Sequence, residues 1–103
     1  MEVLHLNQES FEKLTNQNEK AVLIDFGATW CGPCQMLAPE LDKLAAAHPE
    51  IIVGKVDVDE CRDLAINLGI NTVPTLFFFR NGEMAQKLVG YMSADDLAKK
   101  LGL

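Results

Sequence analysis

The sequence has no long apolar run, and its first residues do not resemble a secretion signal. No segment of the 103-residue chain approaches the ~20 consecutive apolar residues that a membrane-spanning helix needs. Residues 1–6 (MEVLHL) lack the basic start and the apolar stretch of a signal peptide. We therefore expect a cytoplasmic protein with no membrane partner.

Positive charge is scarce as well. The chain has 9 Lys and Arg against 15 Asp and Glu, which gives a formal net charge of −6 at pH 7. Its basic residues never cluster beyond the pair Lys99 and Lys100. A protein that binds nucleic acid or an anionic membrane needs a basic surface. The composition therefore argues against both partners and otherwise indicates only a well-solvated surface.

The chain has few cysteines. Cys31, Cys34 and Cys61 are too few and too unevenly spaced for a secreted domain that is held together by disulfides. In a reducing compartment they would remain thiols unless they take part in redox chemistry. Cys61 falls on an apolar helical stripe, so we interpret it as a small packing residue rather than a regulatory thiol.

What the chain does contain is enough apolar sequence for one folded domain over residues 1–103. It is 49% hydrophobic and 23% charged, which excludes disorder as its main state. A chain of this length buries roughly two-thirds of its unfolded surface, enough for one modest core.

Strand and helix patterns alternate along the chain. The nearly continuous apolar run 21–26 is typical of a strand buried on both faces of a parallel sheet. Asn81-Gly82 is a strong hairpin signal, so the last two strands are predicted to pair antiparallel. The result is an α/β fold with a mixed sheet. Strands are predicted at 3–6, 21–26, 51–58, 75–79 and 83–89, and a loop at 16–18. Helices are predicted at 8–15 and 34–48, in a short segment that Asp59 caps and Gly69 ends, and after a cap at Ser93.

A Cys-x-x-Cys pair, Cys31 and Cys34, lies where the buried strand 21–26 leads into a helix. Such a pair serves zinc sites as well as redox sites. Zinc would need four ligands, here Cys61 and one of His5 or His48 besides the pair. Because Cys61 lies on the apolar stripe of another helix, we disfavour a metal site.

The redox interpretation has a clear physical basis. The thiolate is the nucleophile, and Cys31 is expected at a helix start, where free N–H groups and the helix dipole favour an anion. Cys34 lies one helical turn further, so the two sulfurs can close a small disulfide. Gly32 and Pro33 set the rigidity of this turn and thereby how readily the pair gives up electrons.

Asp25 interrupts the apolar run 21–26, and Lys55 interrupts the apolar run 51–58 in a similar way. Burying a carboxylate without a partner is costly, and loss of solvent raises its pKa, which suits a proton shuttle near neutral pH. We expect Asp25 and Lys55 to share a site. The alternative is a pair at strand ends that solvent partly wets.

The run Trp30–Cys34 (WCGPC) resembles the active site of the thioredoxin family, and the similarity covers essentially the whole chain. Residues 72–75 (TVPT) resemble the family's loop, in which a cis proline faces the thiols. Five further residues fall on matching positions: Asp25, Pro39, Lys55, Gly82 and Gly90. The resemblance implies a five-stranded mixed sheet in the order 1-3-2-4-5, flanked by four helices. Pro39 is expected to kink the second helix.

The resemblance also implies a general protein thiol-disulfide oxidoreductase. Cys31 would attack a substrate disulfide, Cys34 would resolve the mixed disulfide, and Asp25 would assist the deprotonation of Cys34. The apolar substrate groove would be lined by Trp30, Val73, Pro74 and Gly90. A thioredoxin reductase would restore the dithiol. The domain would carry electrons as a monomer, with no bound cofactor besides the redox-active Cys31–Cys34 disulfide.

Three residues depart from the family pattern. Gly27 stands where an aromatic residue is usual, so packing beside Asp25 is expected to be looser and wetter. Gln35 replaces a usual Lys or Arg, which removes a positive charge near Cys31. Tyr91 replaces a small residue and is expected to crowd the rim of the groove.

Two other functions fit parts of this pattern. One is a non-catalytic subunit that binds a partner in the groove, but such a subunit would not need an intact cysteine pair. The other is an oxidase or isomerase, which usually carries a histidine between its cysteines and works outside the cytosol. Gly32 and Pro33 argue against the second.

Overall fold

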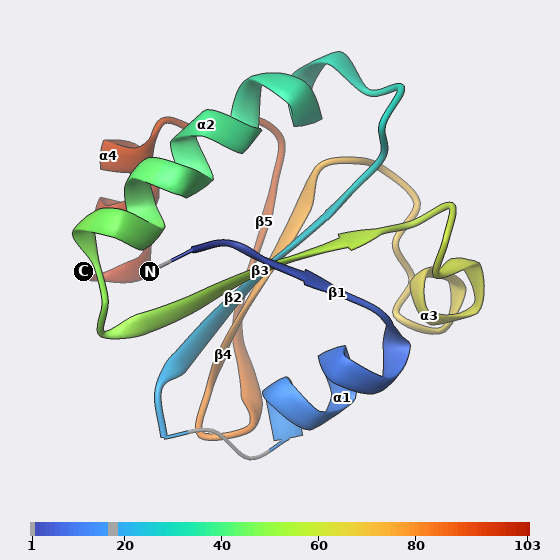
Figure 1. Cartoon of the computed structure of the whole chain (residues 1–103), viewed down its shortest axis with the longest axis horizontal. Helices are drawn as coiled ribbons and strands as arrows, with labels where there is room; N and C mark the ends of the chain where they lie inside the picture. Colours follow the sequence, from blue (N-terminus) through green and yellow to red (C-terminus); the bar gives the residue numbers. More distant parts are fainter. Residues whose placement is uncertain (1, 17–18) are drawn as a thin grey trace.

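A computed structural model describes residues 2–16 and 19–103, which form one sheet between two layers of helices (Figure 1). Asn16 closes the first helix, and the remainder of the loop predicted at 16–18 lies outside the described residues. No helix in the described part is long and apolar enough to cross a membrane. In chain order the elements are β1 (Leu4–Leu6), α1 (Gln8–Asn16), β2 (Ala21–Gly27), α2 (Gly32–Ala47), β3 (Ile51–Asp57), α3 (Arg62–Asn67), β4 (Thr75–Arg80), β5 (Glu83–Val89) and α4 (Ala94–Leu101).

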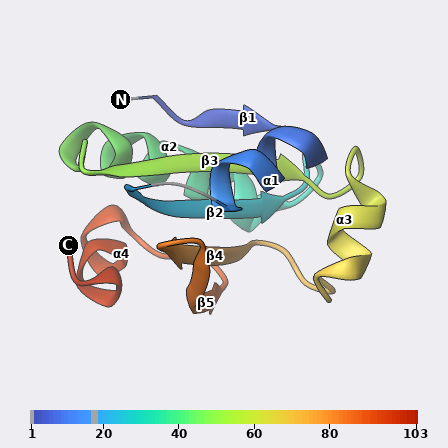
Figure 2. The ribbon, with the colours of Figure 1, turned by 90° about the horizontal axis from the view of Figure 1, so that it is seen from below.

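The strands lie in the order β1-β3-β2-β4-β5, as the family resemblance implied. Figure 2 shows them one beside the next in this order. β3 pairs in parallel with β1 and β2, whereas β4 pairs antiparallel with β2 and β5. The apolar strand β2 is therefore central, and its parallel pairing with β3 sets Asp25 directly beside Lys55.

Each face of the sheet is covered by two helices, because β2 sends alternate side chains to opposite faces. Leu23 packs under α2 and α4, beside Leu41 and Leu97. Ile24 packs on the other face, beside Phe11 of α1 and Leu64 of α3. Burial of each such side chain stabilises the fold by roughly 1.5–3 kcal/mol. Both layers therefore hold the central strand rigidly, and the site lies at its end.

The two largest differences from the predicted boundaries are at the starts of α2 and α3. α2 begins at Gly32, not Cys34, because Cys31 is its N-cap and Pro33 suits the first turn. The prediction that Asp59 caps α3 is wrong. That helix begins at Arg62 after Cys61, without a side-chain cap. The preceding turn is held by Asp57, whose carboxylate accepts the N–H groups of Asp59 and Glu60.

Other local predictions are confirmed. Ser93 accepts the N–H of Asp96 and so caps α4. Gly69 follows the end of α3 with a φ of +71°, the left-handed conformation that glycine adopts most readily. Pro39 lies inside α2, and the helix continues through it. The kink that Pro39 is expected to introduce stays a prediction.

Candidate active site

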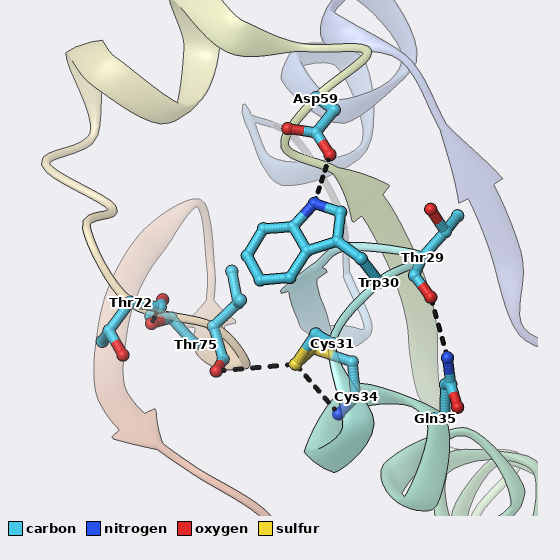
Figure 3. The surroundings of a disulfide bond; sticks show 9 residues. Thr29, Trp30, Cys31, Cys34, Gln35, Asp59, Thr72 and Thr75 are labelled. Atoms are coloured by element: carbon cyan, nitrogen blue, oxygen red, sulfur yellow. Dashed lines mark hydrogen bonds between the residues drawn. A yellow bond between two sulfur atoms is a disulfide. The ribbon is translucent and has the colours of Figure 1, made fainter.

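Cys31 and Cys34 lie at the amino-terminal end of α2 and are joined by a disulfide, with their Cα atoms 5.2 Å apart. Both side chains are buried. The N–H of Cys34 donates to Cys31 Sγ at 3.2 Å, and Cys31 Sγ lies 3.7 Å from the carbonyl oxygen of Val73 (Figure 3). The structure thus places Cys31 at the helix start, where the N–H of Cys34, which has no partner within the helix, points at the Cys31 sulfur.

The loop before β4 faces the cysteine pair. The Val73–Pro74 peptide bond is cis, as the family resemblance implied, and Val73 packs against the two cysteines. The N–H of Gly90 donates to the carbonyl oxygen of Pro74 at 2.9 Å, which holds the end of β5 against this loop. The structure therefore brings Val73, Pro74 and Gly90 together beside the disulfide.

Trp30 stands beside this loop with 69% of its surface exposed. Its indole Nε1–H donates to the carboxylate of Asp59 at 2.8 Å (Figure 3). An exposed tryptophan that is fixed by a hydrogen bond presents a large, rigid apolar surface next to the cysteines. Sequence analysis missed Asp59 as a site residue. The two residues are 29 positions apart in the sequence, and no sequence pattern marks their contact.

Reduction of the disulfide is expected to raise the fluorescence of Trp30. A disulfide quenches indole emission at contact range, and Trp30 directly precedes Cys31. Because Trp30 is the only tryptophan in the chain, the steady-state emission spectrum reports on this site alone. A protein with both Cys31 and Cys34 replaced by serine is the control and should not respond to reductant. Equal emission from the oxidised and reduced wild-type protein would show that the indole points away from the pair.

Asp25 lies at the buried end of the site, one strand away from Lys55. Only 1% of its surface is exposed, and neither carboxyl oxygen has a hydrogen-bond partner among the described residues. Burial raises its pKa from 3.8 to about 6, and the positive charge of Lys55 opposes this rise. The structure brings Asp25 and Lys55 together, because they are register partners in β2 and β3 and both line the same cavity.

This cavity, which we call the Gly27 cavity, has a volume of about 510 Å³ and lies where β2 and β3 end against α2. Gly27 is the last residue of β2. A Cβ atom there would lie 3.3 Å from Cys34 Sγ and 3.8 Å from Asp25 Oδ1. The structure therefore has open space beside Asp25. Looser packing was expected there, because Gly27 stands where an aromatic side chain is usual.

Three other residues from the sequence analysis have clear positions. Gln35 Nε2 donates to the carbonyl oxygen of Thr29 at 2.8 Å and ties the loop to α2 (Figure 3). Tyr91 is 43% exposed, next to Gly90. Cys61 is partly buried against the core layer under α1 and α3. Burial, followed by the nearby Glu60 and Asp57, raises the pKa of Cys61, which keeps it a thiol, as a packing role requires.

Metal ligands are not gathered anywhere in the described ranges 2–16 and 19–103. No group of three or more His, Cys, Asp or Glu side chains there is arranged to hold a metal ion. The reactive groups that the site does contain are the cysteine pair and, nearby, the carboxyl of Asp25.

Comparisons with known proteins agree with this geometry. The sequence model of the thioredoxin family matches residues 2–102. Thioredoxin-1 of Caenorhabditis elegans is 43% identical over 95 residues, 91% of this chain and 82% of that protein. Thioredoxin of Alicyclobacillus acidocaldarius is 42% identical over 86 residues, 82% of each chain.

Solved structures give the same assignment. The crystal structure of chloroplastic thioredoxin z superimposes with a TM-score of 0.92 at 32% identity, over 99% of this chain and 93% of that one. A second solved structure concerns the thiol-resolving mechanism of a yeast mitochondrial 1-Cys peroxiredoxin through the glutathione and thioredoxin systems. One of its chains superimposes with a TM-score of 0.82 at 37% identity, over 97% of this chain and 92% of that one. The chain therefore belongs to the thioredoxin family, and it is a protein thiol-disulfide oxidoreductase.

Proposed function

We propose that Cys31 is the nucleophile and that Cys34 resolves the mixed disulfide. The observation that carries this assignment is the Cys34 N–H, which donates to Cys31 Sγ at the start of α2. After reduction, the same donor and the helix dipole stabilise a thiolate on Cys31. Cys34 receives no such hydrogen bond from the described residues, so its sulfur carries the proton.

The cycle needs two exchange steps. The Cys31 thiolate bonds to one substrate sulfur, and the other substrate sulfur leaves as a thiolate. Cys34 then loses its proton and attacks Cys31 Sγ, which releases the second substrate thiolate and leaves the Cys31–Cys34 disulfide. Asp25 accepts the Cys34 proton. Asp25 has a pKa of about 6 and lines the same cavity as Cys34. Both properties suit that proton transfer near neutral pH.

Substrate proteins bind at the surface around Trp30, Val73 and Gly90. The fourth predicted groove residue, Pro74, is buried and shapes the loop through its cis peptide bond. Trp30 supplies an exposed apolar ring, and the cis-proline loop supplies backbone groups next to the disulfide. An extended segment that carries a disulfide fits such a surface, because its backbone can pair with the loop while its side chains contact the ring. Peroxidases are among the substrates we propose, since one similar structure concerns a peroxiredoxin.

The oxidised protein is returned to the dithiol by a thioredoxin reductase, and no cofactor is bound by the chain itself. We further propose that residues 1–103 act as a single domain and a monomer in the cytoplasm. Gly32 and Pro33, with no histidine between the cysteines, fit a reductase that works in a reducing compartment. Gel filtration and cell fractionation test the monomer and the location.

A redox titration against glutathione tests the direction of electron flow. We expect a potential near the reference value of about −270 mV that characterises thioredoxins, well below the roughly −120 mV of the oxidase DsbA. The oxidised protein should also consume NADPH when a thioredoxin reductase is added. A potential in the oxidase range, or no turnover with reductases from several sources, would contradict the proposed role as a reduced electron carrier.

A further inference from the structure

The Gly27 cavity is lined by two groups that can react with or bind a small molecule. One is the carboxyl of Asp25, which is buried and has no hydrogen-bond partner among the described residues. The other is Cys34, whose sulfur would lie 3.3 Å from a Cβ at Gly27. An unpartnered buried carboxyl is costly, and a ligand that donates a hydrogen bond would remove that cost. The cavity therefore joins a reacting sulfur to an unsatisfied acceptor.

The size of the cavity suits a small molecule. Its volume of about 510 Å³ lies within the roughly 300–1,000 Å³ that is usual for ligand pockets. Glycine is the residue that keeps it open toward Cys34, since any side chain at position 27 would begin at contact distance from the Cys34 sulfur. Exposed Thr29 and Gln35 also line the cavity, so it opens to solvent.

The charges around the cavity favour a cationic ligand. Asp25, Asp57 and Glu60 line it with carboxyl groups, whereas Lys55 supplies one ammonium group. His5 also lines it and adds positive charge only when it is protonated. Carboxyl groups therefore outnumber permanent cations three to one, and a ligand with an amino group is attracted more strongly than an anionic one.

We infer that the Gly27 cavity binds a small aminothiol, or the disulfide of one, which exchanges with the protein at Cys34. The ammonium group of the ligand meets the carboxylates, and its sulfur meets Cys34 Sγ. Protein substrates, in contrast, reach the disulfide from the side of Trp30 and the cis-proline loop. The two cysteines would then serve two classes of reactant through two separate openings.

The exchange balances with two molecules of the thiol. The thiolate of the first bonds to Cys34 Sγ, the Cys31–Cys34 bond breaks, and its electron pair leaves on Cys31 Sγ. The second thiolate attacks the ligand sulfur, which releases the small disulfide and leaves Cys34 as a thiolate. The two small thiols are oxidised and the protein disulfide is reduced, while a proton from Asp25 or solvent returns to Cys34.

The reverse half-reaction gives the cleaner test. In a Cys31→Ser protein, serine still caps α2, and Cys34 is the remaining sulfur at the site. This protein is incubated with three disulfides of similar size: cystamine, which is cationic, hydroxyethyl disulfide, which is neutral, and dithiodipropionate, which is anionic. Adducts are mapped on tryptic peptides, because Cys34 lies in residues 21–43 and Cys61 in residues 56–62.

We expect adducts at Cys34 to form fastest with cystamine and slowest with dithiodipropionate. Adding Gly27→Trp should abolish the adduct at Cys34, whereas Cys61, a partly buried thiol that does not line the cavity, should stay unmodified in both proteins. Should Gly27→Trp fail to fold by circular dichroism, Gly27→Ala replaces it, since its Cβ already meets Cys34 Sγ. A Cys34 adduct whose rate is unaffected by the substitution, or the absence of any adduct at Cys34, would overturn the inference.

A matched pair of charge substitutions tests the ligand class. Glu60→Gln should lower the preference for cystamine over dithiodipropionate by about threefold, the size of effect that one exposed charge pair gives. Glu83→Gln makes the same change on exposed β5, outside the cavity, and should leave the preference unchanged. Equal rates for the three disulfides, or equal effects of both substitutions, would refute an aminothiol site. Insulin reduction by the wild-type protein tests the family activity separately.

Discussion

Replacing Cys31 with serine should abolish the reduction of insulin disulfides, whereas replacing Cys34 with serine should trap mixed disulfides with substrates. Cys31 is the sulfur that accepts a helical N–H, so it is the thiolate that attacks. Without Cys34 the first exchange still occurs, but no second thiolate is available to release the substrate. The measurements are the turbidity of reduced insulin and the mass of adducts after incubation with an oxidised protein substrate.

Cys61→Ser is the matched control, because it removes the third cysteine and leaves the pair intact. It should reduce insulin at the wild-type rate, since Cys61 packs against the core layer under α1 and α3. If Cys31→Ser trapped protein substrates and Cys34→Ser did not, the roles of the two cysteines would be reversed. Adducts with small disulfides are scored separately, because they enter by the Gly27 cavity.

Replacing Asp25 with alanine should stabilise the protein at pH 7 and slow substrate reduction. Burial raises the pKa of Asp25 from 3.8 to about 6, so the folded protein binds more protons than the unfolded chain between these values. Stability therefore falls as pH rises through this window. The rise in pKa from 3.8 to about 6 corresponds to a loss of about 3 kcal/mol from the free energy of unfolding at pH 7. At pH 4 the carboxyl is protonated in the folded protein, so the alanine should gain little there.

The measurement is a pair of denaturant titrations at pH 4 and pH 7, alongside the rate of insulin reduction. Lys55 favours ionised Asp25 and so reduces the gain, and water entering the Gly27 cavity would reduce it further. Asp25→Asn keeps the shape and removes only the charge. Asp42→Ala, on the exposed side of α2, should shift neither activity nor the pH dependence. Two outcomes would leave Asp25 a structural residue. One is an Asp25→Ala protein whose stability relative to wild type is lower at pH 7 than at pH 4. The other is an Asp25→Ala protein that is fully active.

Much of the fold follows from local patterns in the sequence. The apolar run 21–26 became the central strand β2, because a strand without polar alternation must be covered on both faces. Asn81-Gly82 became the β4–β5 hairpin, since both residues adopt positive φ there. Cys31 lies at a helix start because the strand must end before Gly32 and Pro33 begin α2. Each of these features depends on neighbours a few residues away.

Other features depended on which segments the sheet brings together. Asp59 was predicted to cap α3, but in the tertiary structure it binds the Trp30 indole instead. The sequence led us to expect that Asp25 and Lys55 share a site, but it is the parallel register of β2 and β3 that makes them direct neighbours.

The sequence by itself therefore determined the order of strands and helices, the reactive pair Cys31 and Cys34, and the exceptional position of Asp25. The tertiary structure alone decided that Asp59 fixes Trp30 and that a cavity joins Asp25 to Cys34. The physical reason is the range of the interactions. Hairpins and helix caps are local, whereas this cavity is space that β1, β2, β3 and α2 together leave unfilled. Gly27 shows only that a side chain is missing, and the packing of β2, β3 and α2 around it determines how much space remains.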